Sequence, residues 1–353
     1  MTDEVIIRTE GKAGRITLNR PKALNALTHA QCLAIEAALA QWRDDPGVSV
    51  VLLDAVGDRA FCAGGDIAQV YRAGITGDYA SGRNFWFDEY RLNATLGAWP
   101  KPIVALMQGF VMGGGVGLGG HVSHRIVGES TQVAMPECGI GLIPDVGGTF
   151  LLARAPGRLG EYLGLTGARM GPGEAIAAGF ADCFLPEADW PGTIARLCET
   201  GDPAALGAHP APPEGFDRGR IDALFAGPDL PAILAAVRAA AAEGCDTAQA
   251  AAKAMARNSP LSMAATLQMI RAQRKDLRDK GALARALRRE YRATWRAMPM
   301  GDFLEGVRAQ IIDKDRTPRW RHADVGALAE EEVAAFLAPL DPAEELPIDD
   351  WRL

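Results

Sequence analysis

The 353-residue sequence lacks several patterns that identify common protein classes. It has no run of about 18 apolar residues, so nothing indicates a membrane-spanning helix. It also has no excess of positive charge, since 37 Lys and Arg stand against 44 Asp and Glu for a net charge of −7. This balance does not favour a nucleic-acid partner, although a local basic pocket for an anionic ligand is still compatible with it.

Neither disulfides nor a targeting segment is indicated. The six cysteines form no CxxC pair, and their scatter fits reduced thiols better than a disulfide framework; they are Cys32, Cys62, Cys138, Cys183, Cys198 and Cys245. The N-terminal segment MTDEVIIRTEGK has neither the apolar core of a signal peptide nor the Arg-rich, acid-poor composition of a transit peptide. We therefore expect a cytoplasmic protein.

Common catalytic and cofactor motifs are missing or incomplete. There is no GxSxG elbow, so no serine nucleophile is indicated. Residues 115–120, GVGLGG, satisfy the dinucleotide-binding pattern GxGxxG, but the β-type run 125–127 follows too soon for a crossover helix. His121 and His124 have no acidic or cysteine partner at ligand spacing. We expect neither a metal ion nor a separate cofactor.

The patterns that are present predict an α/β fold. The hydrophobic content of 48% can bury a full core, as one large domain with an appendage or as two domains. Thr28 is a candidate N-cap, and a helix is also expected to begin near Ile67. Short β-type and helical segments alternate along the chain. The expected strands are 5–7 and 15–18, which form a hairpin, and the buried runs 48–53 and 103–107.

The chain beyond residue 150 changes in character. Residues 201–216 are rich in proline, alanine and glycine and are typical of a linker. The remainder is mostly helical by its periodicity, with expected helices at 231–242, 247–257, 261–279, 282–297 and 330–337. We therefore divide the chain into a core of residues 1–200, the linker 201–216, and a C-terminal helical region of residues 217–353.

The stretch Lys101–Phe150 holds the candidate active site. A buried strand is followed by glycines, which let backbone amides approach a ligand with no side chain in the way. Glu137 lies among apolar residues that disfavour its charged form and raise its pKa, and Asp145 follows eight residues later. The alternatives are that the glycines only form a tight turn and that Asp145 caps the helix after Gly147 and Gly148.

Four motifs in this order resemble those of the crotonase (enoyl-CoA hydratase/isomerase) superfamily: NRPKALNA at 19–26, FCAGGDI at 61–67, MGGG at 112–115, and PE at 136–137 with IPDVGG at 143–148. Further motifs are similar to those of the 3-hydroxyisobutyryl-CoA hydrolase family within it: DEYRLN at 88–93, AMPE at 134–137, NSP at 258–260, REY at 289–291, and DFLEGVR at 302–308 with IDKD at 312–315. This second resemblance covers nearly the whole chain.

The resemblance implies a ββα spiral core that binds acyl-CoA, with the C-terminal helices added to it. Two backbone amides, by position those of Gly65 and Gly114, would polarise the thioester carbonyl and stabilise the developing oxyanion. The turns that would hold the nucleotide and pantetheine contain Lys22, Ala23, Leu24, Ala63, Asp66 and Ile67. Lys22 is either a phosphate contact or an ordinary surface lysine. Coenzyme A would be part of the substrate, which leaves no separate cofactor.

The resemblance also implies roles for three carboxyl groups in thioester hydrolysis. Glu137 would attack the thioester to form a mixed anhydride or would activate water, and these two routes stay open. Asp145 would handle the proton of the leaving thiol. By this resemblance Glu89 matches a position that contacts substrate, at its hydroxyl group, and the alternative is a solvated helix glutamate. The implied substrate is 3-hydroxyisobutyryl-CoA or a similar short 3-hydroxyacyl-CoA, as in valine breakdown.

Two other functions remain open at this point. An enoyl-CoA hydratase of the same fold uses two glutamates, but Gly117 occupies the position of the second, and Asp145 replaces a residue that is usually glycine there. A non-catalytic acyl-CoA-binding protein is the other alternative, against which Glu137 and Asp145 argue. The expected partner is an acyl-CoA, without nucleic acid or membrane, and a homo-oligomer is compatible with the superfamily.

Overall fold

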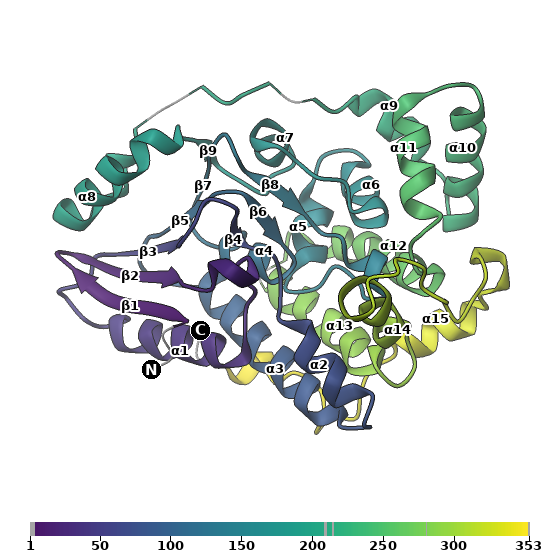
Figure 1. The fold of residues 1–353 in the computed structure, drawn as a ribbon, viewed down its shortest axis with the longest axis horizontal. Coiled ribbons are helices and arrows are strands. Elements are labelled where there is room, and N and C mark those ends of the chain that lie inside the picture. The colour runs from purple at the N-terminus through teal and green to yellow at the C-terminus, as the bar shows by residue number, and fades with distance from the viewer. Residues whose placement is uncertain (1–3, 208–209, 214, 280, 352–353) are drawn as a thin grey trace.

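The computed structural model describes residues 4–207, 210–213, 215–279 and 281–351. It has the α/β architecture expected from the sequence, with a mainly parallel sheet at one end of the molecule and helices at the other (Figure 1). The main sheet has the strand order β1-β2-β3-β5-β7-β9, formed by Val5–Glu10, Ala13–Leu18, Val50–Ala55, Ile103–Met107, His124–Val127 and Cys183–Phe184. Only the β1–β2 hairpin is antiparallel, as its glycine turn predicts.

A second, smaller sheet was not expected. Its three strands, β4, β6 and β8, pair in parallel and consist of Ala60–Cys62, Phe110–Met112 and Gln132–Ala134. Each of its strands follows a strand of the main sheet along the chain, so the polypeptide alternates between the two sheets. This alternation produces the spiral, and it brings the segments after β4, β6 and β8 to one place.

The helices before residue 201 cover these sheets. They are α1 to α8, formed by His29–Trp42, Ile67–Gly74, Tyr79–Gly97, Gly114–Gly119, Gly148–Arg154, Leu159–Thr166, Pro172–Ala177 and Trp190–Thr200. Helix α1 begins as predicted, because Thr28 and Gln31 form a reciprocal capping box. Helix α4 was not predicted: the glycines that satisfy GxGxxG are themselves largely helical.

The C-terminal helices pack on this core. They are α9 to α15, formed by Arg218–Leu224, Leu230–Ala242, Asp246–Met255, Pro260–Asp276, Ala282–Ala297, Phe303–Val307 and Glu330–Leu337. Helix α12 contacts α5 and α6, and α13 contacts α3 and α5. Residues 201–207 of the expected linker include a short 3-10 turn, Pro203–Leu206, and the division into core, linker and helical region stays a prediction.

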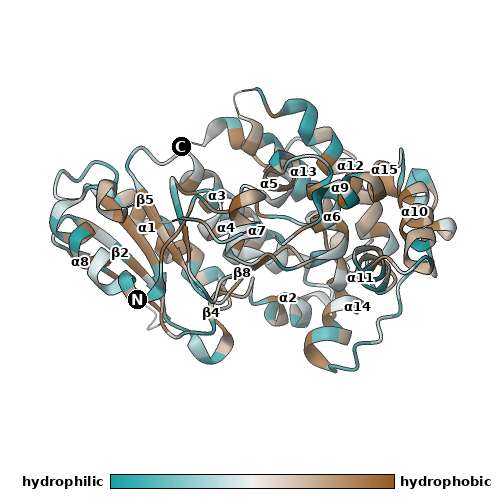
Figure 2. Ribbon diagram, turned by 90° about the horizontal axis from the view of Figure 1, so that it is seen from above, coloured by the Kyte–Doolittle hydropathy of each residue, from teal (hydrophilic) through white to brown (hydrophobic). Residues whose placement is uncertain are grey.

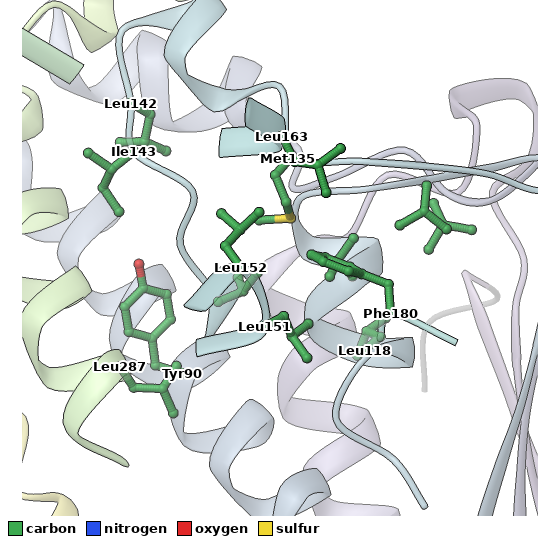
Figure 3. Close-up of a cluster of buried hydrophobic side chains, with 14 of the residues drawn as sticks. Tyr90, Leu118, Met135, Leu142, Ile143, Leu151, Leu152, Leu163, Phe180 and Leu287 are labelled. Carbon is green, nitrogen blue, oxygen red and sulfur yellow. The ribbon is translucent and has the colours of Figure 1, made fainter. Parts of the chain in front are cut away.

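The buried core runs through both parts of the chain. Figure 2 draws the strands near β5 mainly in brown, the colour of hydrophobic residues. Figure 3 shows Tyr90 of α3 beside Leu287 of α13 and Ile143 of the loop before α5, so side chains from three distant segments share one cluster. All six cysteines are free thiols. Within the described residues, no helix has the length and apolarity needed to cross a membrane.

Candidate active site

A cavity of about 620 Å³ lies where the turns after β4, β6 and β8 meet. Helix α3 and the segment around residues 310–316 complete its wall. Its lining includes five of the predicted catalytic and substrate-contact residues, namely Gly65, Glu89, Gly114, Glu137 and Asp145. The structure therefore brings together residues that are up to 80 positions apart in the sequence.

The backbones of the two glycine turns nearly touch. A side chain is excluded at Gly115, because a Cβ there would lie 2.1 Å from the carbonyl oxygen of Cys62. A Cβ on Gly114 would lie 3.3 Å from the amide nitrogen of Gly65. Neither of these two N–H groups donates to an acceptor among the described residues. Both predicted donors are thus close together, at the cavity, and available to a ligand oxygen.

Glu137 is the first residue of a 3-10 turn, Glu137–Ile140, just after β8. Its side chain is 5% exposed, and Oε2 has no hydrogen-bond partner within the described structure. A Cβ on Gly113 would lie 2.8 Å from its Oε1, which places the carboxyl group directly beside the glycine turn. Burial, reinforced by the charge of Asp145, raises the pKa of Glu137 well above its ordinary value, as its apolar neighbours predict.

Glu89 lies on α3 and points to the same glycines. It is 2% exposed, so the alternative of a solvated helix glutamate is wrong. Its Oε1 has no partner in the described part of the chain and would lie 2.8 Å from a Cβ on Gly114. Burial, and next the charge of Asp145, raise the pKa of Glu89 well above its ordinary value. A protonated Glu89 can donate a hydrogen bond into the cavity.

Asp145 lies in the loop before α5 and is 5% exposed. Tyr90 of α3 donates a hydrogen bond of 2.8 Å from its hydroxyl group to Oδ2 of Asp145. Burial raises the pKa of Asp145 to about 7, and the Tyr90 hydrogen bond partly opposes that rise. A carboxyl group with a pKa near neutrality is suited to giving and taking a proton under physiological conditions.

The structure rejects the alternative that Asp145 caps α5. Gly147, the N-cap residue, has no side chain that could accept a hydrogen bond, and the cap comes from Glu290 of α13 instead. Glu290 accepts hydrogen bonds from the amides of Gly147, at 2.7 Å, and Thr149, at 2.9 Å. The carboxylate of Asp145 is therefore not used for capping.

The predicted nucleotide-binding residues divide into two groups. Ala63 and Ile67 line the cavity, whereas Lys22, Ala23, Leu24 and Asp66 do not. The two loops are nevertheless joined, since the Ala63 amide donates to the Leu24 carbonyl oxygen at 3.1 Å. Asp66 forms an ion pair of 2.9 Å with Arg20. Lys22 is exposed on a 3-10 turn at the protein surface, and its role as a phosphate contact stays a prediction.

His121 belongs to the same neighbourhood but has an ordinary structural contact. Its Nε2 lies 2.7 Å from the carbonyl oxygen of Val146. Burial lowers the pKa of His121 to about 4, so a neutral ring donates this hydrogen bond. The contact fixes the residue that directly follows Asp145.

Several residues at or near the cavity were not predicted from the sequence. Asn93 does not line the cavity, but it is fully buried near Gly117, and neither end of its amide has a partner within the described structure. It follows Glu89 by four positions on a helix, so helical spacing alone was a usable signal for it. Others had no such signal because they are distant in sequence. Phe85, Trp86, Arg169, Arg257, Gln310 and Arg316 line the cavity.

Known proteins that are similar to this chain in sequence belong to the family that its motifs resemble. Residues 13–337 match the family described as enoyl-CoA hydratase/isomerase. The chain belongs to the enoyl-CoA hydratase/isomerase family. A zebrafish relative named 3-hydroxyisobutyryl-CoA hydrolase, mitochondrial, is 36% identical over 96% of this chain and 90% of its own length. The Arabidopsis thaliana protein named 3-hydroxyisobutyryl-CoA hydrolase 1 is 34% identical over 98% of this chain and 94% of its own.

A solved structure is more similar still. The crystal structure of an enoyl-CoA hydratase from Rhodobacter sphaeroides 2.4.1 is 56% identical, covers 98% of this chain and 99% of its own, and superposes with a TM-score of 0.93. The crotonase fold predicted from the motifs is thereby confirmed. The zebrafish and Arabidopsis relatives are named as hydrolases and the Rhodobacter structure as a hydratase, so the relatives differ in the reaction that their names give.

The expected cytoplasmic location is wrong on these comparisons. The relatives from zebrafish, frog, chicken and rat are all named as mitochondrial proteins. The expectation depended on the composition of the N-terminal residues, and composition near one end is weak evidence about location.

Proposed function

We propose that the protein hydrolyses the thioester of 3-hydroxyisobutyryl-CoA, or of a similar short 3-hydroxyacyl-CoA, to the free acid and coenzyme A. The observation that carries the proposal is the placement of two buried carboxyl groups, Glu137 and Asp145, in the cavity with the amides of Gly65 and Gly114. The names of the zebrafish and Arabidopsis relatives supply the substrate. Such a reaction belongs to valine catabolism.

The two amides would act as an oxyanion hole. As a nucleophile attacks the thioester carbonyl carbon, negative charge develops on the carbonyl oxygen. Amides that are fixed in place and shielded from water stabilise that charge without reorganisation, each by about 3 kcal/mol in well-studied enzymes. Gly65 and Gly114 have N–H groups without a partner in the described chain, which suits them to this task.

Glu137 and Asp145 would divide the remaining chemistry. In one route a carboxylate oxygen of Glu137 bonds to the carbonyl carbon, the C–S bond breaks, and Asp145 gives its proton to the departing sulfur. Water then cleaves the mixed anhydride and returns a proton to Asp145. In the other route Glu137 takes a proton from the attacking water, and Asp145 protonates the sulfur in the same way. Both routes need the same two groups.

Glu89 and the glycine at position 117 would set the substrate. A protonated Glu89 at the cavity wall can donate a hydrogen bond to a hydroxyl group on the acyl chain. The alternative is hydration of an enoyl-CoA, which the name of the Rhodobacter structure favours. That reaction needs a second glutamate, at the position that Gly117 occupies here. A Cβ on Gly117 would lie 2.8 Å from both Nδ2 of Asn93 and Cβ of Val146. There is no carboxyl group at this position, and no room for one.

Two substrates distinguish these functions. Purified protein is mixed with 3-hydroxyisobutyryl-CoA and, separately, with crotonyl-CoA, while free thiol is titrated and the enoyl absorbance is followed. We expect thiol release from the first substrate and no loss of enoyl absorbance with the second. Rapid loss of that absorbance without thiol release would establish a hydratase, and binding of both compounds without turnover would establish a non-catalytic acyl-CoA-binding protein.

A further inference from the structure

The turn from Asp145 to Thr149 is held in a conformation that its own residues do not favour. Val146 has φ of +54°, in the left-handed region, where a β-branched side chain is rarely found. Gly147 follows with φ of +78°. Backbone of this kind persists only where surrounding contacts fix it, and it is concentrated at functional sites. The contacts that fix this turn therefore also determine where the carboxyl group of Asp145 lies.

Beside the hydrogen bond from His121 to Val146, Glu290 supplies three side-chain contacts to this turn. It lies on α13, more than 140 residues away in sequence, and its side chain is completely buried. One carboxylate oxygen accepts from the amide of Gly147, and the other accepts from the amide and the hydroxyl group of Thr149. Among the described residues no arginine or lysine pairs with Glu290. Burial raises the pKa of Glu290 to about 8, against the hydrogen bonds from Thr149 and Gly147. A buried carboxyl group whose partners all belong to one turn has the properties of a clamp on that turn.

Helix α13 reaches Asp145 by a second path. Tyr291, the next residue, packs edge to face against Tyr90, with ring centroids 6.1 Å apart. Tyr90 in turn donates its hydroxyl hydrogen bond to Asp145. One helix of the C-terminal region thus holds both the backbone that carries Asp145 and the side chain that orients its carboxyl group.

We infer that Glu290 is a positioning residue, which acts on thiol release by holding the turn that carries Asp145. This inference rests on the proposed thioester hydrolysis. Glu290 does not line the cavity, so its effect is transmitted through Asp145 and not through contact with substrate.

The test uses Glu290→Gln, which has nearly the same shape. An amide offers one acceptor and one donor, so either the amide of Gly147 or that of Thr149 meets a second donor, and the turn relaxes. A displacement of about 1 Å of a catalytic group costs on the order of 100-fold in rate. We expect kcat for 3-hydroxyisobutyryl-CoA to fall about 10- to 100-fold, with KM within about twofold of the wild-type value.

The matched control is Glu161→Gln. Glu161 is equally buried, but it lies on α6, where Arg158 and Arg274 are its ionic partners, and it does not line the cavity. This variant should lose stability and keep kcat per folded molecule. Circular dichroism and thermal denaturation of both variants separate loss of folded protein from loss of turnover.

A double-mutant cycle shows whether the effect passes through Asp145. In an Asp145→Asn background, Glu290→Gln should lower the residual turnover by less than twofold, because the group that it positions is already gone. Thr149→Val deletes only the hydroxyl donor to Glu290 and should give a smaller loss of kcat. It replaces Glu290→Gln in the test if that variant does not fold.

The outcomes separate the two proposals. A wild-type protein that releases no thiol would overturn the proposed hydrolysis. If the wild-type protein hydrolyses the thioester and Glu290→Gln has an unchanged kcat, the role of Glu290 is overturned and the hydrolysis stands. Thr149→Val decides in the same way if Glu290→Gln does not fold. Equal losses in Glu290→Gln and Glu161→Gln, or fully additive losses in the cycle, would make Glu290 a stabilising residue only.

Discussion

The three carboxyl groups of the cavity share one physical property: they are buried, and none has a cationic partner in the described chain. Burying a carboxyl group without a cation destabilises its charged form, so such a group keeps its proton to a higher pH than usual. Each of the three pKa values is accordingly raised. Raised pKa values concentrated in one cavity are typical of catalytic acid–base groups. Core packing alone gives no reason to bury three carboxyl groups side by side.

Glu137→Gln tests the residue at the centre of the proposed chemistry. The amide has almost the same shape but is neither a base nor a useful nucleophile, so turnover should fall by at least about 100-fold. Binding of the acyl-CoA and the thermal midpoint should stay close to wild type, because the uncharged form of the side chain is the one that burial favours. Steady-state thiol release and isothermal titration calorimetry measure the two effects. A Gln variant with full turnover would remove Glu137 from the mechanism.

At the scale of elements, the site depends on two glycine turns that meet back to back. The segment after β4 and the N-terminus of α4 approach so closely that a Cβ on Gly115 would collide with the backbone of Cys62. Gly114, next to it, has more room, since its nearest neighbours are the side chain of Glu89 and the amide of Gly65. A methyl group there would therefore enter the proposed oxyanion site without preventing the turns from meeting.

Gly114→Ala should abolish most thioester cleavage. The new methyl carbon would lie 3.3 Å from the amide nitrogen of Gly65, within the space that the thioester oxygen needs. Losing one donor of an oxyanion hole costs about 100- to 1000-fold in kcat. The control is Gly192→Ala in α8, where a Cβ meets only the end of the Arg196 side chain at 3.6 Å. That variant should keep its activity and gain up to about 1 kcal/mol of stability, because alanine favours helix interiors over glycine. Equal activity of the two variants would contradict the assignment.

At the scale of the whole molecule, the C-terminal region completes the site. Its loops and turns contribute Arg257, Gln310 and Arg316 to the cavity wall, and helix α13 contributes Glu290 to the turn behind it. Removal of this region would therefore disturb the turn that carries Asp145 as well as the packing around it. The helical region is a structural part of the candidate active site, and its status as a separate domain stays a prediction.

The buried acids should also make the stability of the whole protein depend on pH. The pKa of Asp145 rises from 3.8 in the unfolded chain to about 7 in the folded state, so the folded protein keeps this proton longer. The stability due to this group is fully present below pH about 4 and is lost as pH rises toward 7. The slope is about 1.4 kcal/mol per pH unit for one proton.

Asp145→Asn removes this dependence. The free energy of unfolding of the variant relative to wild type should increase from pH 5 to pH 7. His121 titrates in the same range, with its pKa lowered to about 4, but it is present in both proteins and cancels in the difference. Urea denaturation at each pH measures both proteins. Parallel curves would show that Asp145 is ionised in the folded state throughout.

The sequence by itself determined the local elements and the motif residues. Helix α1 begins after Thr28 because its cap is formed with a residue three positions away. Helix α13 has the predicted bounds because its periodicity is strong, and α15 has the predicted bounds as well. Glu137 and Asp145 were recognisable because isolated acids among glycines and apolar residues are unusual. Such signals are contained within a few neighbouring residues, and no tertiary structure is needed to read them.

Only the tertiary structure decided the second sheet, the burial of Glu89 and the true cap of α5. Strands of three residues are too short for a periodic signal, so the sheet of β4, β6 and β8 forms only when the spiral aligns them. Asp145 precedes α5 by only a few residues and is a candidate cap by sequence, but the cap is Glu290, 143 residues beyond Gly147. Contacts across such a separation leave no trace in local sequence, because they exist only once folding has packed α13 against α5.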